Sequence, residues 1–286
     1  MRTAFSIDPD QGLDEPDELR LVRLAADRGY ASAWTPARAD ASAFERCVRW
    51  HEASGLPVAI SAVPASGQPA TFYAEHALRA WRGTGGRFTL VLGSGRLAPA
   101  AERTRAYLAE LRGLLPPELP LYLAALGPLM LRLAGGAADG VALNWCTAGH
   151  VAWSRGRIAE GAEAAGHPSP AVVEYIRTAV DGEADRARST LAAAVSRYAF
   201  APPAYRRHFE RMGFADDVRR AEAPGGTWDA RFLSAVGAFG TPGSVRGQVE
   251  RLAVGLDLPI VRVLARSRGD AASAQAVLEE CAPAGA

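Results

Sequence analysis

The residues best suited to chemistry surround a Gly-Pro break within residues 121–145, LYLAALGPLMLRLAGGAADGVALNW. Residues 121–123 predict an apolar strand, and Pro128 suits the first turn of a helix, where a missing N–H costs nothing. Gly127 lets the backbone come close to a ligand above that strand. The free N–H groups of such a helix end suit an anion, for example a phosphate. The same residues also fit an ordinary turn between a strand and a helix.

Four charged residues near predicted strands are candidates for catalysis or binding. Asp8 follows the first strand and is the best-placed carboxylate for acid–base work, although Asp-Pro-Asp is also ordinary turn chemistry. Arg38 lies just past the second strand. Its side chain suits binding of an anionic substrate, but an ordinary solvated loop arginine fits the sequence as well. Glu174 falls within the strand at residues 171–180. If it points inward it needs a partner such as Arg177; if it points outward it is merely amphipathic.

Cysteine and histidine spacing gives no metal motif. Cys47, Cys146 and Cys281 are too scattered for a metal site or a disulfide framework. No pair of histidines has the spacing of a motif such as H-E-x-x-H. His150 follows the sixth strand and can approach a site, whereas His208 reads as a surface residue. We therefore predict no metal.

Composition narrows the functional class. The chain has 286 residues, a net charge of +1 and 49% hydrophobic residues, so it can bury one large core and shows no sign of binding nucleic acid or an anionic membrane. All 32 basic residues are arginine, which excludes Schiff-base, pyridoxal phosphate and lysine-dependent P-loop chemistry. The first residues form no apolar signal segment, and no run approaches the ~18 apolar residues of a membrane span. We expect a cytoplasmic protein.

Apolar strands alternate with helical patterns along the chain. Strands are predicted at residues 3–7, 31–34, 56–63, 88–92, 121–123, from 139 onward, 171–180 and 259–264. Eight such alternations favour an α/β fold, a (β/α)₈ TIM barrel forming one domain over residues 1–286. A doubly wound sheet is disfavoured because Asp8-Pro9-Asp10 stands where its G-x-G-x-x-G motif belongs. Residues 182–239 interrupt this alternation of strands and helices. They predict a helical insertion near the barrel mouth, with helices at residues 185–200 and 203–212.

Several segments together resemble a known family. They are TGGRFTLVLGSG (84–95), the Gly-Pro segment, LNWCTAGHVA (143–152), AYRRHFERMGF (204–214) and FGTPGSVRGQVERL (239–252). In order, they resemble the bacterial luciferase-like flavin- and deazaflavin-dependent oxidoreductases. The resemblance implies a barrel that holds reduced flavin mononucleotide (FMN) or coenzyme F420 at its C-terminal mouth, a small-molecule substrate and a homodimer. These motifs are most similar to the branch that uses coenzyme F420, a deazaflavin that carries hydride and does not activate oxygen.

The resemblance also implies which residues touch the cofactor. They are Ala62, Val63, Gly93, Ser94, Gly95, Ala125, Leu126, Gly127, Pro128, Leu129, Met130 and Asn144. Around Ala62 and Val63 the family often has a strained non-prolyl peptide under the ring. Beyond the resemblance, Trp34 suits the wall of a flat ring, and Arg177 is a further candidate cofactor contact.

Three departures from the family keep alternatives open. Leu129 stands where many relatives have a basic residue, so a phosphate would rely on backbone N–H groups, the helix dipole (~0.3–1 kcal/mol if exposed) and arginines from elsewhere. Trp34 is not followed by the usual acidic residue, and the loop after Gly95 is short. We predict F420-dependent hydride transfer to or from a small organic substrate. The alternatives are an oxygen-dependent FMN monooxygenase and a non-catalytic cofactor-binding or scaffold relative.

Overall fold

A closed barrel of parallel strands forms the centre of the molecule. The computed structural model describes residues 2–200 and 203–283. In these residues the barrel strands are β1 (Ala4–Ser6), β2 (Ala33–Thr35), β3 (Val58–Pro64), β4 (Phe88–Gly93), β5 (Leu121–Ala124), β6 (Gly140–Asn144), β7 (Ala171–Val180) and β9 (Leu258–Val263). Strands β1 to β7 pair in sequence order, and β9 closes the barrel between β7 and β1. The predicted TIM barrel is confirmed.

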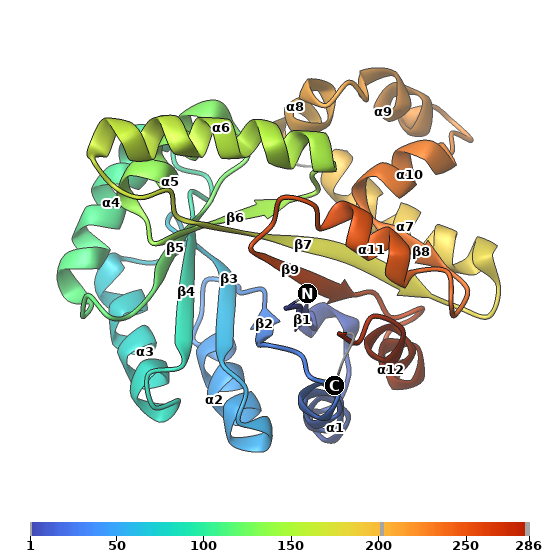
Figure 1. Cartoon of the computed structure of the whole chain (residues 1–286), viewed down its shortest axis with the longest axis horizontal. Helices are drawn as coiled ribbons and strands as arrows, with labels where there is room; N and C mark the ends of the chain where they lie inside the picture. Colours follow the sequence, from blue (N-terminus) through green and yellow to red (C-terminus); the bar gives the residue numbers. More distant parts are fainter. Residues whose placement is uncertain (1, 201–202, 284–286) are drawn as a thin grey trace.

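Helices surround the barrel, as Figure 1 shows. They are α1 (Glu15–Asp27), α2 (Ser42–Ser54), α3 (Ala70–Gly83), α4 (Ala100–Leu114), α5 (Pro128–Ala137), α6 (Ala148–Ala165), α11 (Arg246–Leu252) and α12 (Ala271–Glu280), with a 3-10 turn at Pro9–Gln11. None of the helices in the described ranges is long and apolar enough to cross a membrane.

The segment between β7 and α11 forms a helical insertion. It contains α7 (Ala184–Ala199), α8 (Pro203–Arg211), α9 (Ala215–Glu222), α10 (Ala230–Val236) and the short strand β8 (Ala238–Gly240). Strand β8 pairs with the end of β7, beyond the residues of β7 that pair with β6. Figure 1 shows α8 to α10 gathered near α7 beside the long strand β7. A separate apolar cluster that includes Trp145, Phe209 and Phe232 stabilises the insertion.

Alternation along the strands divides the buried side chains into two layers. Trp34, Val91 and Tyr175 belong to a small cluster of residues from the barrel strands. Their neighbours in sequence, such as Ile176 and Leu92, belong to the larger cluster that includes residues of the surrounding helices. This pattern follows from the two-residue period of a β-strand.

Glycines bring α5 and α6 into backbone contact. A Cβ atom on Gly135 would lie 2.0 Å from the carbonyl oxygen of Ile158, and one on Gly161 would lie 2.0 Å from that of Arg132. Any larger residue at either position would force the helices apart. The close packing fixes the position of α5, whose N-terminus faces the barrel mouth.

Candidate functional site

A cavity of about 510 Å³ opens at the C-terminal ends of the barrel strands, and we name it the mouth cavity. Its volume is typical of small-molecule and cofactor sites. Its lining comes from the strand ends and from the insertion: Pro36, Ala37, Ser61, Ala62, Pro64, Gly93, Ser94, Gly95, Ala100, Ala124, Ala125, Leu126, Gly127, Met130, Ala142, Leu143, Asn144, Tyr175, Tyr198, Ala204, Tyr205 and Arg262.

Small side chains make one wall of the mouth cavity. A Cβ atom on Gly93 would lie 3.5 Å from the Cβ of Ala62 and 3.9 Å from the Cβ of Ala124, so these three residues form a continuous surface. The Ser61–Ala62 peptide is cis, and the β3–β4 register shifts at this point. The hydroxyl of Tyr175 donates to the carbonyl oxygen of Ser61 at 3.2 Å. Such a wall leaves room for a flat ring system.

The N-terminus of α5 forms one end of the mouth cavity. Gly127 is its N-cap, no side chain caps it, and a Cβ on Gly127 would meet no atom within 4 Å. Free N–H groups facing open space make a suitable anion site. Leu129 does not line the cavity and is 67% exposed. Instead, Arg211 of α8 lies nearby, and its Nη1 donates to the carbonyl oxygen of Leu126 at 3.4 Å.

A buried arginine contacts Asn144 and Tyr198, two residues that line the mouth cavity. Arg177 is 1% exposed, and its Nη1 donates to Oδ1 of Asn144 at 2.6 Å. Its guanidinium lies over the rings of Trp145 (3.9 Å) and Tyr198 (4.5 Å). Burial lowers the pKa of Arg177 to about 10, so it stays charged at neutral pH. Within the described residues no carboxylate forms an ion pair with it, and its Nη2 has no hydrogen-bond partner.

Asn144 links this arginine to the insertion. Its Nδ2 donates to the hydroxyl of Tyr205 at 2.6 Å, which ties the end of β6 to α8. Burial raises the pKa of Tyr205 to about 12, so the phenol stays protonated at neutral pH. The same amide therefore joins β6, β7 and α8 at the mouth.

Asp8 forms an ion pair at the barrel mouth. It accepts three hydrogen bonds from Arg262, at 2.9 and 3.1 Å from Nε and at 2.5 Å from Nη2. The guanidinium of Arg262 also lies 4.9 Å from the centroid of the Tyr175 ring. Asp8 thus neutralises Arg262 and is not a free base. No local sequence pattern identifies Arg262 as a partner of Asp8, because 254 residues separate the two.

A second cavity of about 660 Å³ shares Tyr198 and Arg262 with the mouth cavity. We name it the cationic cavity because arginines outnumber carboxylates in its lining. The charged lining residues are Arg177, Arg197, Arg262, Arg266, Arg268, Asp8 and Asp10. An excess of fixed positive charge in a recess favours an anionic ligand.

Six predicted site residues, Leu129 among them, lie outside both cavities. Arg38 is exposed and pairs with Asp10 at 2.6 Å, so it is a solvated loop arginine. Trp34 belongs to the cluster of barrel residues and donates to Ser32, whereas Val63 belongs to the outer apolar layer. Pro128 does not line the mouth cavity either. Strand alternation explains Val63, because adjacent residues on a strand point to opposite faces and its neighbour Ala62 faces the cavity.

Glu174 is also placed away from both cavities, which corrects the prediction that it is catalytic. It is buried, and its Oε1 accepts a hydrogen bond from the backbone N–H of Cys146 at 2.6 Å. Burial raises the pKa of Glu174 to about 8. Arg177, three residues further along β7, forms no hydrogen bond or ion pair with it, because an odd spacing puts the two side chains on opposite faces.

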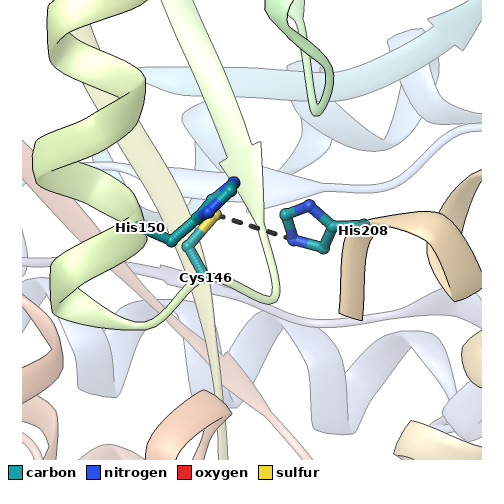
Figure 2. Close-up of side chains that lie close together, drawn as sticks. All are labelled: Cys146, His150 and His208. Atoms are coloured by element: carbon teal, nitrogen blue, oxygen red, sulfur yellow. Dashed lines mark hydrogen bonds between the residues drawn. The ribbon is translucent and has the colours of Figure 1, made fainter. Parts of the chain in front are cut away.

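The prediction that His208 lies at the surface is wrong. His208 is fully buried, and its Nε2 lies 3.1 Å from the carbonyl oxygen of Trp145 and 3.8 Å from Sγ of Cys146. The His150 and His208 ring centroids are 4.9 Å apart. Figure 2 shows these side chains converging from separate parts of the chain. Sequence spacing gave no signal for this contact, because 62 residues separate Cys146 from His208.

The sequence matches a known protein family. A family model described as luciferase-like monooxygenase matches residues 98–256, which is more than half of the chain. The chain belongs to this family.

Solved structures similar to this luciferase-like chain span its whole length. The coenzyme F420-dependent tetrahydromethanopterin reductase of Methanopyrus kandleri has a TM-score of 0.75 and 19% identity, with 98% of each chain covered. An F420-dependent secondary alcohol dehydrogenase in complex with an F420–acetone adduct has a TM-score of 0.68 and 16% identity over 98% of each chain. The oxygenating constituent of 3,6-diketocamphane monooxygenase of Pseudomonas putida, in complex with FMN, has a TM-score of 0.65 and 13% identity over 99% of each chain. These similarities show the shared barrel fold.

The mouth cavity of this luciferase-like barrel fits a flavin-type cofactor. It has a small-residue wall for a ring and an open helix end for a phosphate, beside a buried guanidinium with an unpaired nitrogen. Its ionisable lining residues are Tyr175, Tyr198, Tyr205 and Arg262, so the lining itself contributes no carboxylate. The arrangement can orient a ligand and stabilise negative charge on it.

Proposed function

We propose that the protein is a coenzyme F420-dependent oxidoreductase that transfers hydride to or from a small organic substrate. The observation that carries this proposal is the pairing of a small-residue wall with the buried, uncompensated guanidinium of Arg177. Hydride transfer requires orientation and stabilisation of charge more than a free base. When bound, coenzyme F420 supplies a deazaflavin that carries hydride and does not activate oxygen.

The residues around the mouth cavity have three roles in this proposal. Ala62, Gly93 and Ala124 give the ring a flat surface. The N–H groups that follow Gly127 and the guanidinium of Arg211 bind the phosphate. Arg177 stabilises negative charge that develops on the ligand, because a fixed cation in a water-poor site interacts strongly with a nearby anion.

Two similar structures that are named for coenzyme F420 support the choice of the deazaflavin, and a third is a complex with FMN. The family description and that FMN complex support the alternative, an oxygen-dependent FMN monooxygenase. A non-catalytic relative is the third candidate, supported by Leu129 at the usual basic position.

A paired turnover assay separates these functions. The purified protein is mixed with reduced coenzyme F420 and a panel of ketones, aldehydes and enones without oxygen, and separately with reduced FMN and oxygen. We expect protein-dependent oxidation of the reduced deazaflavin with one substrate class, and no oxygen consumption above that of free reduced FMN. Protein-dependent oxygen consumption would overturn the proposal in favour of the monooxygenase. The variant Arg177→Met serves as the control for turnover at this site.

A further inference from the structure

Three potential metal ligands meet where the barrel contacts the insertion. Cys146 follows β6, His150 lies in the first turn of α6 and His208 lies in α8. One donor atom of each lies within 4.8 Å of the donor atoms of the other two, and all three side chains are buried. Figure 2 shows the cysteine and the two imidazoles facing one another. Thr147, whose hydroxyl accepts the N–H of His150 at 3.0 Å, fixes the turn between the first two ligands.

Buried polar atoms around this cluster have no partners. His150 Nε2, His208 Nδ1 and Glu174 Oε2 form no hydrogen bond within the described structure. Burying such atoms unpaired is unfavourable, and a metal ion bound by His150 would satisfy its ring nitrogen. His208 Nε2 lies 3.1 Å from the carbonyl oxygen of Trp145 and 3.8 Å from Sγ of Cys146.

We propose that Cys146, His150 and His208 bind a Zn²⁺ ion. One thiolate and two imidazoles are a donor set that zinc prefers over calcium or magnesium. Glu174 accepts a hydrogen bond from the backbone N–H of Cys146 at 2.6 Å, which helps to position the cysteine. The thiolate would partly neutralise the charge of a divalent ion, which lowers the cost of burying both.

The distances allow the three ligands to occupy three corners of a zinc tetrahedron after a small contraction. Zinc–sulfur and zinc–nitrogen bonds of about 2.3 and 2.0 Å put tetrahedral donor atoms about 3.5 Å apart. The separation between Cys146 Sγ and His208 Nε2 is already 3.8 Å. The largest donor separation, within 4.8 Å, must close by roughly 1 Å.

The ion would act as a structural link between the barrel and α8. None of its three ligands lines the mouth cavity. However, α8 supplies Tyr205 and Arg211 to the region of the mouth cavity, through contacts with Asn144 and Leu126. Fixing His208 to the end of β6 therefore fixes the helix that carries both residues.

The test measures metal binding by the full-length chain. We expect elemental analysis to find about one zinc ion per chain after exposure to Zn²⁺ and gel filtration. Replacement of zinc by Co²⁺ should give tetrahedral d–d bands and a thiolate-to-cobalt charge-transfer band. Cys146→Ser should abolish the charge-transfer band, and His208→Gln should reduce the bound metal at least tenfold. The matched controls Cys281→Ser and His167→Gln should keep one ion and both signals, because neither residue belongs to the cluster.

Two results would overturn the proposal. One is a wild-type chain that retains no more Zn²⁺ than the Cys146→Ser, His208→Gln double variant. The other is a charge-transfer band that survives in Cys146→Ser. If the variants do not fold, chelation of the wild-type chain provides the test: removal of the ion should lower the melting temperature, and Zn²⁺ should restore it. An unchanged melting temperature in a chain shown to have lost its zinc would contradict a structural link.

Discussion

The side-chain oxygen of Asn144 accepts a hydrogen bond from the buried guanidinium of Arg177 at 2.6 Å. Because the acceptor is a neutral amide, this bond orients the guanidinium without cancelling its charge. The positive charge of Arg177, which lines the cationic cavity, therefore remains uncancelled, in contrast to that of Arg262, whose charge Asp8 neutralises. This difference between two neighbouring arginines is the basis of the first prediction.

Asn144→Asp should weaken cofactor binding while the protein stays folded. The new carboxylate pairs with Arg177 and neutralises it, and its second oxygen accepts from the Tyr205 hydroxyl that the amide now contacts. A lost charge-assisted interaction of about 1.5–3 kcal/mol corresponds to roughly a 10- to 100-fold higher Kd. Isothermal titration gives the Kd, and circular dichroism checks the fold. Unchanged affinity in a folded variant would show that Arg177 does not meet the ligand's charge.

Arg211→Gln should weaken binding of a phosphate-bearing cofactor about 3- to 10-fold. The guanidinium lies beside the N-terminus of α5, where it adds to the helix dipole. Arg207→Gln is the matched control, because Arg207 is an exposed arginine of the same helix. The same chromophore without its phosphate should bind both variants and the wild type equally. Equal losses in the two variants would point to a general charge effect.

Gly93→Leu should block the ring while leaving the barrel intact. A Cβ at this position meets Ala62 and Ala124 at ordinary contact distances, so the added side chain extends along the small-residue wall of the mouth cavity. Gly113→Leu is the control, since a Cβ there meets no atom within 4 Å and the residue lies on the exposed face of α4. We expect loss of cofactor fluorescence quenching in the first variant alone. Quenching retained in Gly93→Leu would place the ring elsewhere.

The cysteines should be unreactive in the metal-free native protein. All three are buried, and burial raises the pKa of Cys281 to about 12. Because a raised pKa favours the thiol, the reactive thiolate is scarce at pH 8 and increases only as the pH approaches 12. A disulfide reagent should therefore label no cysteine at pH 8 until denaturant unfolds the chain. Fast labelling of a folded sample would contradict the burial of these residues.

The sequence predicted the barrel well where the apolar patterns are long. Strand β7 has the predicted bounds, because it is a continuous apolar pattern between clear turn residues. The family resemblance implied that Gly127 and Asn144 both contact the cofactor, and both line the mouth cavity. Helices α9 and α10 were not predicted, since α9, for example, is short and rich in charged residues.

The rest of the site depends on contacts between distant parts of the chain. Arg262 meets Asp8 across 254 residues, and Tyr205 meets Asn144 across 61. No local pattern specifies such pairs. The position of Glu174 depends on which face of β7 points inward, which a strand buried on both faces does not reveal.

The most direct test of the central claim is a paired fluorescence titration of the purified protein with coenzyme F420 and with FMN. The proposed function predicts saturable binding of coenzyme F420 with at least tenfold preference over FMN, and loss of that binding in Arg177→Met. Equal or tighter binding of FMN would contradict the claim and favour oxygen chemistry. Binding of neither cofactor at high micromolar concentration would contradict it as well and favour a non-catalytic barrel.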